Sequence, residues 1–386
     1  GTKGLSLFIV PKIWVNPDGS LGENNDVITV GIEHKMGIKG SATATLNFGE
    51  NDNCRGILVG NPPVEGKGEG MAQMFQMMNG ARMDTGMAGY TLATMAYFNA
   101  AEYARNRVQG RPYNDPKGSR VPIINHADIR RILLNLKACT EGMRAMAFKT
   151  YYYFDVSRHS PREEERQRAR DRIEVMTPLV KAYCSDMVWP LVGDAIQLYG
   201  GYGFSEEYPL AQIARDCKIY SLWEGTNYIQ SMDLVGRKWN LKQGQVFVDW
   251  LEDIETIIKT NTSREDFAAE SAIMEKGLAS YKRIKAMMDE FKQQGQGEML
   301  PLYATRILHA TSQLCCGALL LDQAALAADK IRELGREHWD LAYYQGKIDA
   351  ARFYIKNHVP AIMNLEAILQ YKDDTAISIM EEALGR

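Results

Sequence analysis

The hydrophobic positions of the sequence follow two different periods, and the change falls near residue 62. Before it, short apolar runs alternate with turn residues, a pattern typical of β-strands and reverse turns. The expected strands are Leu5–Val10, Val27–Ile32, Ala42–Phe48 and Gly56–Val59. The segment Asn16-Pro17-Asp18-Gly19 predicts a turn between the first two. Because so few strands bury little surface, we expect residues 1–62 to be part of a larger β-domain.

From Gly66 onward apolar residues recur every three to four positions, which predicts helices. The most apolar stretch carries Arg82 and Asp84 in its middle, so we expect a buried helix there and not a membrane span. The first two expected helices are Met71–Val108 and His126–Val156. A third starts with Ser160 as N-cap and Pro161 as its first residue, and it is expected to end at a break over Gly193–Tyr208. A fourth helix is expected over Glu224–Trp239.

A second helical unit is expected after a linker at Asn240–Gln245. Apolar residues from Val246 onward again recur at helical spacing, and several helices with short connections predict a bundle. The pattern therefore divides the chain into a β part over residues 1–62, a helical domain over 63–240 and an additional helical domain over 241–386.

The composition limits the class of protein. Of the 386 residues, 45 are Lys or Arg and 48 are Asp or Glu, so the net charge is −3. A charged fraction of 24% and an apolar fraction of 45% predict globular domains with a core and not a disordered chain. The nearly neutral balance also disfavours a nucleic-acid-binding protein, which is usually clearly basic.

The cysteines and histidines give no sign of a disulfide framework or a metal site. The six cysteines form no C-x-x-C motif, which predicts reduced, buried thiols in a cytoplasmic protein. The six histidines never fall at metal-ligand spacing. The sequence starts at Gly1 directly before a strand-like run and shows no signal peptide, so we expect a fragment or processed chain that begins inside a domain.

Glu224 is the strongest candidate for catalysis among the acidic residues. It lies in the segment Ser221–Asn227, between Trp223 and Gly225. An acid at the start of a helix often only complements the helix dipole. The functional alternative is a general base, because partial burial next to a tryptophan raises a carboxylate's affinity for protons and the glycine leaves it approachable.

Two arginines and a glycine turn are further candidates. The turn Gly200–Gly203 lacks the G-x-G-x-x-G spacing of a dinucleotide fold, so it predicts either a helix C-cap or close approach of the backbone to a cofactor. Arg107 ends a long helix, where it would complement the dipole or bind a phosphate. Arg82 lies in an apolar stripe, and a buried arginine needs an anion, which a bound ligand or an internal ion pair would supply.

Taken together, these segments resemble the acyl-CoA dehydrogenase family. Residues 194–230 contain, in order and at the family's spacing, Q-x-x-G-G-x-G, R-D-x-K-I-Y and E-G-T-x-x-I-Q, and Arg82 and Arg107 match two upstream arginines. Residues 241–386 resemble the extra C-terminal domain of a longer branch that includes 3-methylmercaptopropionyl-CoA dehydrogenase-like enzymes. The resemblance implies a mostly α fold, with a partial β-domain, a four-helix bundle and a second C-terminal helical bundle.

The resemblance also implies FAD-dependent α,β-dehydrogenation of an acyl-CoA thioester. Glu224 matches the base that takes the α-proton, while the β-hydrogen leaves as hydride to flavin N5. Position 81, where other branches carry the base, is Ala81. The implied cofactor-binding residues are Arg107, Gln197, Gly200, Gly201 and Thr226, of which Arg107, Gln197 and Gly201 match residues that reach the FAD of a neighbouring subunit. The implied substrate-binding residues are Asn79, Arg82, Trp223 and Gly225.

The implied partners are an electron-transfer flavoprotein and further copies of the chain, as a homodimer or dimer of dimers.

The sequence differs from the family pattern in three ways. From the resemblance we expect the family's N-terminal helical domain and the first half of its β-domain to be missing from this chain. The phenylalanine of R-x-x-F-G is missing after Arg107, and Tyr113–Val121 is a polar insertion. The alternatives are an acyl-CoA oxidase and a flavin-free fragment that acts in assembly. A DNA-associated branch of the fold is disfavoured by the net charge.

Overall fold

The computed structural model describes residues 2–335 and 337–385. The chain forms two compact units, Gly1–Ala81 and Arg82–Arg386, and each is treated by itself. The long helix α1, Gly70–Asn106, runs through the boundary. Within the described residues no helix is both long enough and apolar enough to cross a bilayer.

The N-terminal unit contains three antiparallel pairs of strands within its described residues. The pairs are β1 (Leu7–Ile9) with β6 (Ile57–Val59), β2 (Ile13–Val15) with β3 (Leu21–Asn24), and β4 (Val27–Ile32) with β5 (Ala44–Phe48). All four predicted strands are confirmed, although three are shorter, while β2 and β3 were missed. The predicted turn joins β2 to β3, where the N–H of Asn16 donates to the carbonyl of Ser20 at 2.9 Å.

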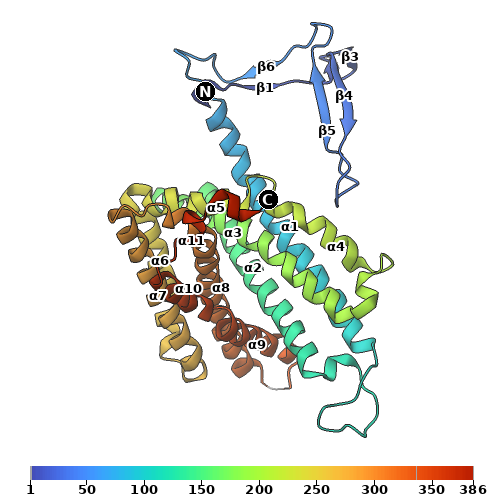
Figure 1. Cartoon of the computed structure of the whole chain (residues 1–386), viewed down its shortest axis with the longest axis vertical. Coiled ribbons are helices and arrows are strands. Elements are labelled where there is room, and N and C mark those ends of the chain that lie inside the picture. The colour runs from blue at the N-terminus through green and yellow to red at the C-terminus, as the bar shows by residue number, and fades with distance from the viewer. Residues whose placement is uncertain (1, 336, 386) are drawn as a thin grey trace. The chain divides into compact units, whose positions relative to one another are not determined.

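A group of helices opens the C-terminal unit and matches the expected first bundle. After α1 come α2 (Ala127–His159), α3 (Glu163–Tyr199), α4 (Pro209–Cys217) and the short α5 (Asn227–Met232). α2 lies along α3, and α4 returns along it (Figure 1). Gly86 lets α1 approach α3 closely, because a Cβ there would lie 2.6 Å from the carbonyl oxygen of Val180.

Three local expectations for these helices were wrong. α3 begins at Glu163, and its N-cap is Arg162, because Ser160 instead caps the C-terminal end of α2. α3 also continues to Tyr199, beyond the expected break at Gly193. The helix expected over Glu224–Trp239 starts at Asn227 and continues past Met232 in π and 3-10 geometry.

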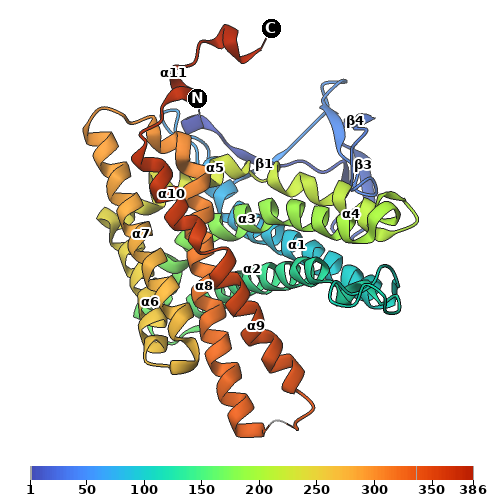
Figure 2. The same ribbon diagram turned by 60° about the horizontal axis from the view of Figure 1, so that its bottom comes forward.

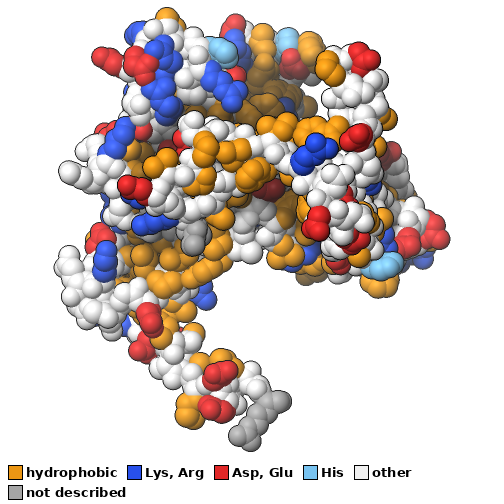
Figure 3. Space-filling view, turned by 90° about the horizontal axis from the view of Figure 1, so that it is seen from above, with side chains coloured by type: hydrophobic (Ala, Val, Ile, Leu, Met, Phe, Trp, Pro, Cys, Tyr) orange, Lys and Arg blue, Asp and Glu red, His pale blue; other side chains and the backbone are white. Residues whose placement is uncertain are grey.

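The second group of helices packs around one buried helix. It comprises α6 (Gln245–Thr262), α7 (Ala268–Gln293), α8 (Met299–Leu334), α9 (Leu341–Asn357) and α10 (Pro360–Gln370), followed by the single turn α11 (Thr375–Ser378). α8 contacts α2, α3, α6, α7, α9 and α10 (Figure 2), which explains why it is apolar on all sides. The segment after Gln370 projects from the unit (Figure 3). Its apolar residues Met380 and Leu384 are exposed.

The two helical groups share one core. The hydroxyls of Tyr183 on α3 and Tyr354 on α9 lie 2.7 Å apart in a hydrogen bond that is fully buried. The six cysteines are free thiols, and all except Cys54 are buried, as predicted. Burial raises the pKa of Cys217 to about 11 and that of Cys316 to about 12, so these thiols stay protonated and act as packing residues.

Candidate active site

The loop before α5 has an unusual backbone. Glu224 has φ +55° and Gly225 has φ +82°, so two consecutive residues are left-handed. For a residue with a side chain this conformation costs about 1–2 kcal/mol, which surrounding contacts must offset. The Glu224 side chain is half-buried. Glu224 stands two residues before Thr226, the N-cap of α5, and so lies outside the first turn of that helix.

Three side chains hold this loop by its carbonyl oxygens. Arg82 on α1 donates from Nε to the carbonyl of Glu224 at 3.4 Å, and Gln230 donates to the carbonyls of Glu224 and Gly225, both at 3.4 Å. Lys181 on α3 donates to the carbonyl of Gly225 at 2.7 Å. Arg82 and Lys181 are both buried. Two buried cations therefore lie against the loop that carries the candidate base.

A polar chain continues from this loop into the second helical group. Lys181 Nζ donates to Asn227 Oδ1 at 2.7 Å, and Asn227 Nδ2 donates to Asp186 Oδ1 at 2.6 Å. The other oxygen of Asp186 lies 2.9 Å from Nε2 of His309 on α8. The loop of Glu224 is thus connected through three side chains to a helix of the additional domain.

Lys181 is electrostatically exceptional. Burial lowers its pKa to about 8, although the nearby charges of Asp186 and Glu224 act in the opposite direction. The side chain of Lys181 has no solvent exposure, so its ammonium is satisfied by the loop carbonyl and by Asn227. A buried, charged lysine of this kind is found where it fixes a local conformation or stabilises a nearby charge.

The neighbours of Glu224 leave one side of the loop open. Trp223 is 40% exposed and lies against Tyr220, with ring centroids 5.6 Å apart. Thr226 is the N-cap of α5, and its hydroxyl accepts from the N–H of Ile229. The N–H of Glu224 forms no hydrogen bond within the described part of the chain and remains available as a donor.

A second cluster lies at the opposite end of the bundle. The guanidinium of Arg107 lies 5.5 Å from the centre of the Tyr202 ring, in the glycine turn that follows α3. Gly200 has φ +63° and its N–H donates to the carbonyl of Gln197, so the turn is a helix C-cap as the structural alternative predicted. Gln197, Gly200 and Gly201 are exposed, and a Cβ added at either glycine would meet no atom of the described residues within 4 Å.

The two clusters do not meet within one chain. A helix rises about 1.5 Å per residue, so Arg82 and the end of α1 at Asn106 lie roughly 36 Å apart. Figure 1 shows α5 at one end of the bundle and the junction of α3 with α4 at the other. Asn79 belongs to the N-terminal unit, and its place relative to Glu224 stays a prediction.

Sequence reasoning missed Lys181, Asp186, Asn227 and His309. The only local signal was a lysine among apolar residues in Thr177–Cys184, the same pattern that identified Arg82. Asp186 lies five residues after Lys181, and His309 comes from a helix far along the chain, so their contact depends on tertiary packing.

Comparison with known proteins places this geometry in a family. Residues 68–238 match the acyl-CoA dehydrogenase, C-terminal domain, and residues 250–380 match the acetyl-CoA dehydrogenase C-terminal like domain. A butyryl-CoA dehydrogenase of Syntrophomonas wolfei is 50% identical over 384 residues, covering 100% of this chain and 63% of its own length. The 3-methylmercaptopropionyl-CoA dehydrogenase of Ruegeria pomeroyi is 41% identical over 238 residues, covering 62% of this chain and 39% of its own.

A crystal structure of an acyl-CoA dehydrogenase complexed with FAD from Bacillus anthracis has the same fold. It superposes with a TM-score of 0.72 at 20% identity and covers 97% of this chain and 62% of that one. The fold and the relatives together define a class, and the chain belongs to the acyl-CoA dehydrogenase family. It spans just under two thirds of the length of the Syntrophomonas relative.

Proposed function

We propose that the protein to which this chain belongs catalyses FAD-dependent α,β-dehydrogenation of an acyl-CoA thioester, with Glu224 as the base. The observation that carries the proposal is the tethered left-handed loop, which holds a half-buried carboxylate beside two buried cations. The name of the Syntrophomonas relative, a butyryl-CoA dehydrogenase, supports the reaction class.

The residues of the loop have complementary roles in this proposal. The Glu224 carboxylate removes the α-proton of the thioester, and the free N–H of the same residue donates to the thioester oxygen as negative charge develops there. Arg82 and Gln230 hold the Glu224 carbonyl, so the side chain and the N–H keep a fixed relation to one another. Trp223 and Gly225 form part of the wall around the acyl group.

The second cluster fits the pyrophosphate of FAD. Nε of Arg107 is buried and has no hydrogen-bond partner among the described residues, so an anion at this position would satisfy it. The open turn at Gly200 and Gly201 leaves room for a cofactor to lie against the backbone. When bound, FAD supplies the acceptor for the β-hydride. Because the clusters are far apart, we assign Arg107, Gln197, Gly200 and Gly201 to the FAD of a neighbouring subunit and Thr226 to the subunit's own FAD, which makes the protein a homodimer or dimer of dimers.

The electrons are proposed to leave to an electron-transfer flavoprotein. An acyl-CoA oxidase is the enzymatic alternative and would release peroxide in air. A flavin-free assembly role is the other alternative, and purified protein without flavin absorbance would favour it.

The test is anaerobic reduction of the flavin by butyryl-CoA and longer acyl-CoAs, in the full-length protein loaded with FAD. We expect flavin bleaching in the wild type and none in Glu224→Gln, with FAD content unchanged. The control Glu206→Gln changes an acid whose side chain is 80% exposed in an ion pair with Arg215 and should react like the wild type. Equal bleaching in both variants would overturn the assignment of the base.

A further inference from the structure

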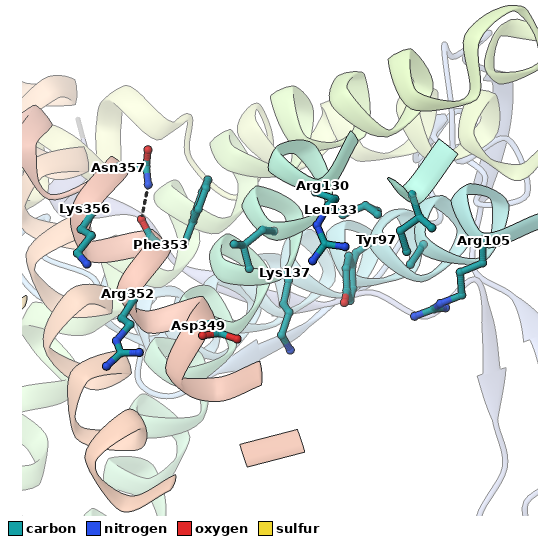
Figure 4. Close-up of a pocket in the computed structure, with 13 residues that line it drawn as sticks. Tyr97, Arg105, Arg130, Leu133, Lys137, Asp349, Arg352, Phe353, Lys356 and Asn357 are labelled. Atoms are coloured by element: carbon teal, nitrogen blue, oxygen red, sulfur yellow. Dashed lines mark hydrogen bonds between the residues drawn. The ribbon is translucent and has the colours of Figure 1, made fainter. Parts of the chain in front are cut away.

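A cavity of about 500 Å³ lies between the two helical groups of the C-terminal unit. α1 and α2 form one side and α9 the other (Figure 4). On α2 the lining residues Arg130, Leu133 and Lys137 follow helical spacing, so they project from one face. On α9 Arg352 and Lys356 do the same. The volume is within the range of pockets that bind small molecules.

The walls carry a concentrated positive charge. Five basic side chains line the cavity, namely Arg105, Arg130, Lys137, Arg352 and Lys356, against the single acid Asp349. This excess contrasts with a chain whose net charge is −3. In Figure 4 Arg105, Arg130 and Lys137 come from the side of the cavity formed by α1 and α2, and Arg352 and Lys356 from the side formed by α9.

Neighbouring acids neutralise only part of this charge. Glu270, which is buried, forms ion pairs with Lys356 at 2.8 Å and with Arg352 at 3.8 Å, and Glu141 pairs with Lys137. Arg105 and Arg130 have no ion-pair partner within residues 2–335 and 337–385. Two guanidinium groups thus face the cavity with their charge uncompensated, and each presents N–H donors suited to a phosphate.

Apolar and aromatic groups complete the cavity. Leu133 is buried in its floor, and the half-buried rings of Tyr97 and Phe353 stand on opposite sides, on α1 and α9. A phosphate alone would not need such walls, whereas a flat aromatic base would cover them. The chemistry of the cavity therefore combines a site for an anion with a site for a ring.

We propose that this cavity binds a nucleoside diphosphate, with the phosphates at Arg105, Arg130 and Lys137 and the base against Tyr97 and Phe353. The same chemistry occurs in free ADP and in the nucleotide end of coenzyme A. The proposal does not depend on the role of Glu224, so Glu224→Gln should leave this binding unchanged.

The experiment is calorimetric titration of the FAD-loaded, full-length protein with ADP, adenosine, inorganic phosphate and coenzyme A. We expect Arg105→Gln and Arg130→Gln each to weaken ADP binding about tenfold or more, because each removes a charge-assisted contact. The matched control is Arg131→Gln, which changes the adjacent residue on α2, an exposed arginine paired with Asp128 at 2.7 Å. All three arginines lie on the surface, so these variants should keep the fold.

The outcomes separate the possible ligands. ADP binding that falls in Arg105→Gln and Arg130→Gln but not in Arg131→Gln supports the proposal, with free nucleotide as the source. The same pattern for coenzyme A without ADP binding also supports it and identifies the coenzyme as the source. Equal affinity for inorganic phosphate and ADP would overturn it, because the base would then not be recognised. ADP binding that neither variant weakens, or no binding at all, would overturn it too.

Discussion

Replacing Lys181 by methionine removes the buried ammonium and keeps the length of the side chain. Burial lowers the pKa of Lys181 from 10.5 to about 8, and this difference corresponds to about 3 kcal/mol of stability. The unfolded chain holds the proton up to pH 10.5, whereas the folded protein releases it near pH 8. The contribution of Lys181 to the free energy of unfolding should therefore be highest above pH 10.5, where the residue is neutral in both states. It should fall as the pH is lowered and be lost once the pH has passed 8, where the folded protein takes up the proton.

The assay is urea unfolding, followed by tryptophan fluorescence, at several pH values between 7 and 11. The free energy of unfolding of the wild type minus that of Lys181→Met should rise by about 3 kcal/mol between pH 8 and pH 10.5. Lys276→Met, which changes an exposed lysine on α7, should give a difference that does not vary with pH. A pH-independent difference for Lys181→Met would refute the account of a buried, charged lysine.

The same variant tests the link between Lys181 and the candidate base. Without the bond to the Gly225 carbonyl, the loop loses its shortest tether, so the Glu224 carboxylate shifts from its reactive position. Displacements of about 1 Å cost on the order of a hundredfold in rate. We expect flavin reduction by acyl-CoA to slow by about tenfold to a hundredfold while FAD content stays normal. Wild-type reduction rates would show that the tether does not position the base.

Three further variants test the loop at Gly225, the link from Asp186 to α8, and His358, a histidine after α9 whose Nε2 lies 2.9 Å from Asn135 Oδ1 on α2. Gly225→Ala should lower the free energy of unfolding by about 1–2 kcal/mol, since φ is +82° and the added Cβ would lie 2.9 Å from Gln230 Nε2; unchanged denaturation midpoints would contradict this. Burial lowers the pKa of His358 from 6.5 to about 4, so its contribution is complete above pH 6.5 and is lost as the pH falls through 4. Between pH 7 and pH 4 the free energy of unfolding of the wild type should therefore fall by about 3 kcal/mol more than that of His358→Gln. Unfolding curves of both proteins at the two pH values would measure this difference. His309→Leu should slow flavin reduction several-fold by removing the bond to Asp186, and an unaltered rate would separate α8 from the active-site loop.

The long helices could be predicted because their signal is local. Apolar residues at helical spacing over tens of positions located α1 and α2 to within a few residues. The strand β3 (Leu21–Asn24) was missed because it contains a single large apolar residue, and β2 (Ile13–Val15) because its short apolar run directly precedes the turn at Asn16. The start of α3 was misplaced because Ser160 and Pro161 form an N-cap signal in the sequence, whereas in the structure Ser160 is the C-cap of α2 and α3 begins at Glu163.

The candidate site was predictable only in part. The motif around Glu224 and the isolated Arg82 were visible in the sequence, and the structure brings these two together. The left-handed conformation of Glu224 was not visible, because a glutamate rarely adopts it and no local pattern indicates it. The chain from Lys181 to His309 was also hidden, since it depends on how the two helical groups pack.

The most direct test of Glu224 as the base is exchange of the substrate's α-hydrogen. Full-length protein loaded with FAD would be incubated anaerobically in deuterated buffer with an acyl-CoA, and deuterium at the α-carbon followed by NMR. The account predicts incorporation by the wild type and by Glu206→Gln, and loss of incorporation in Glu224→Gln even though the acyl-CoA still binds. Continued exchange in Glu224→Gln would show that another group removes the proton and would contradict the central claim.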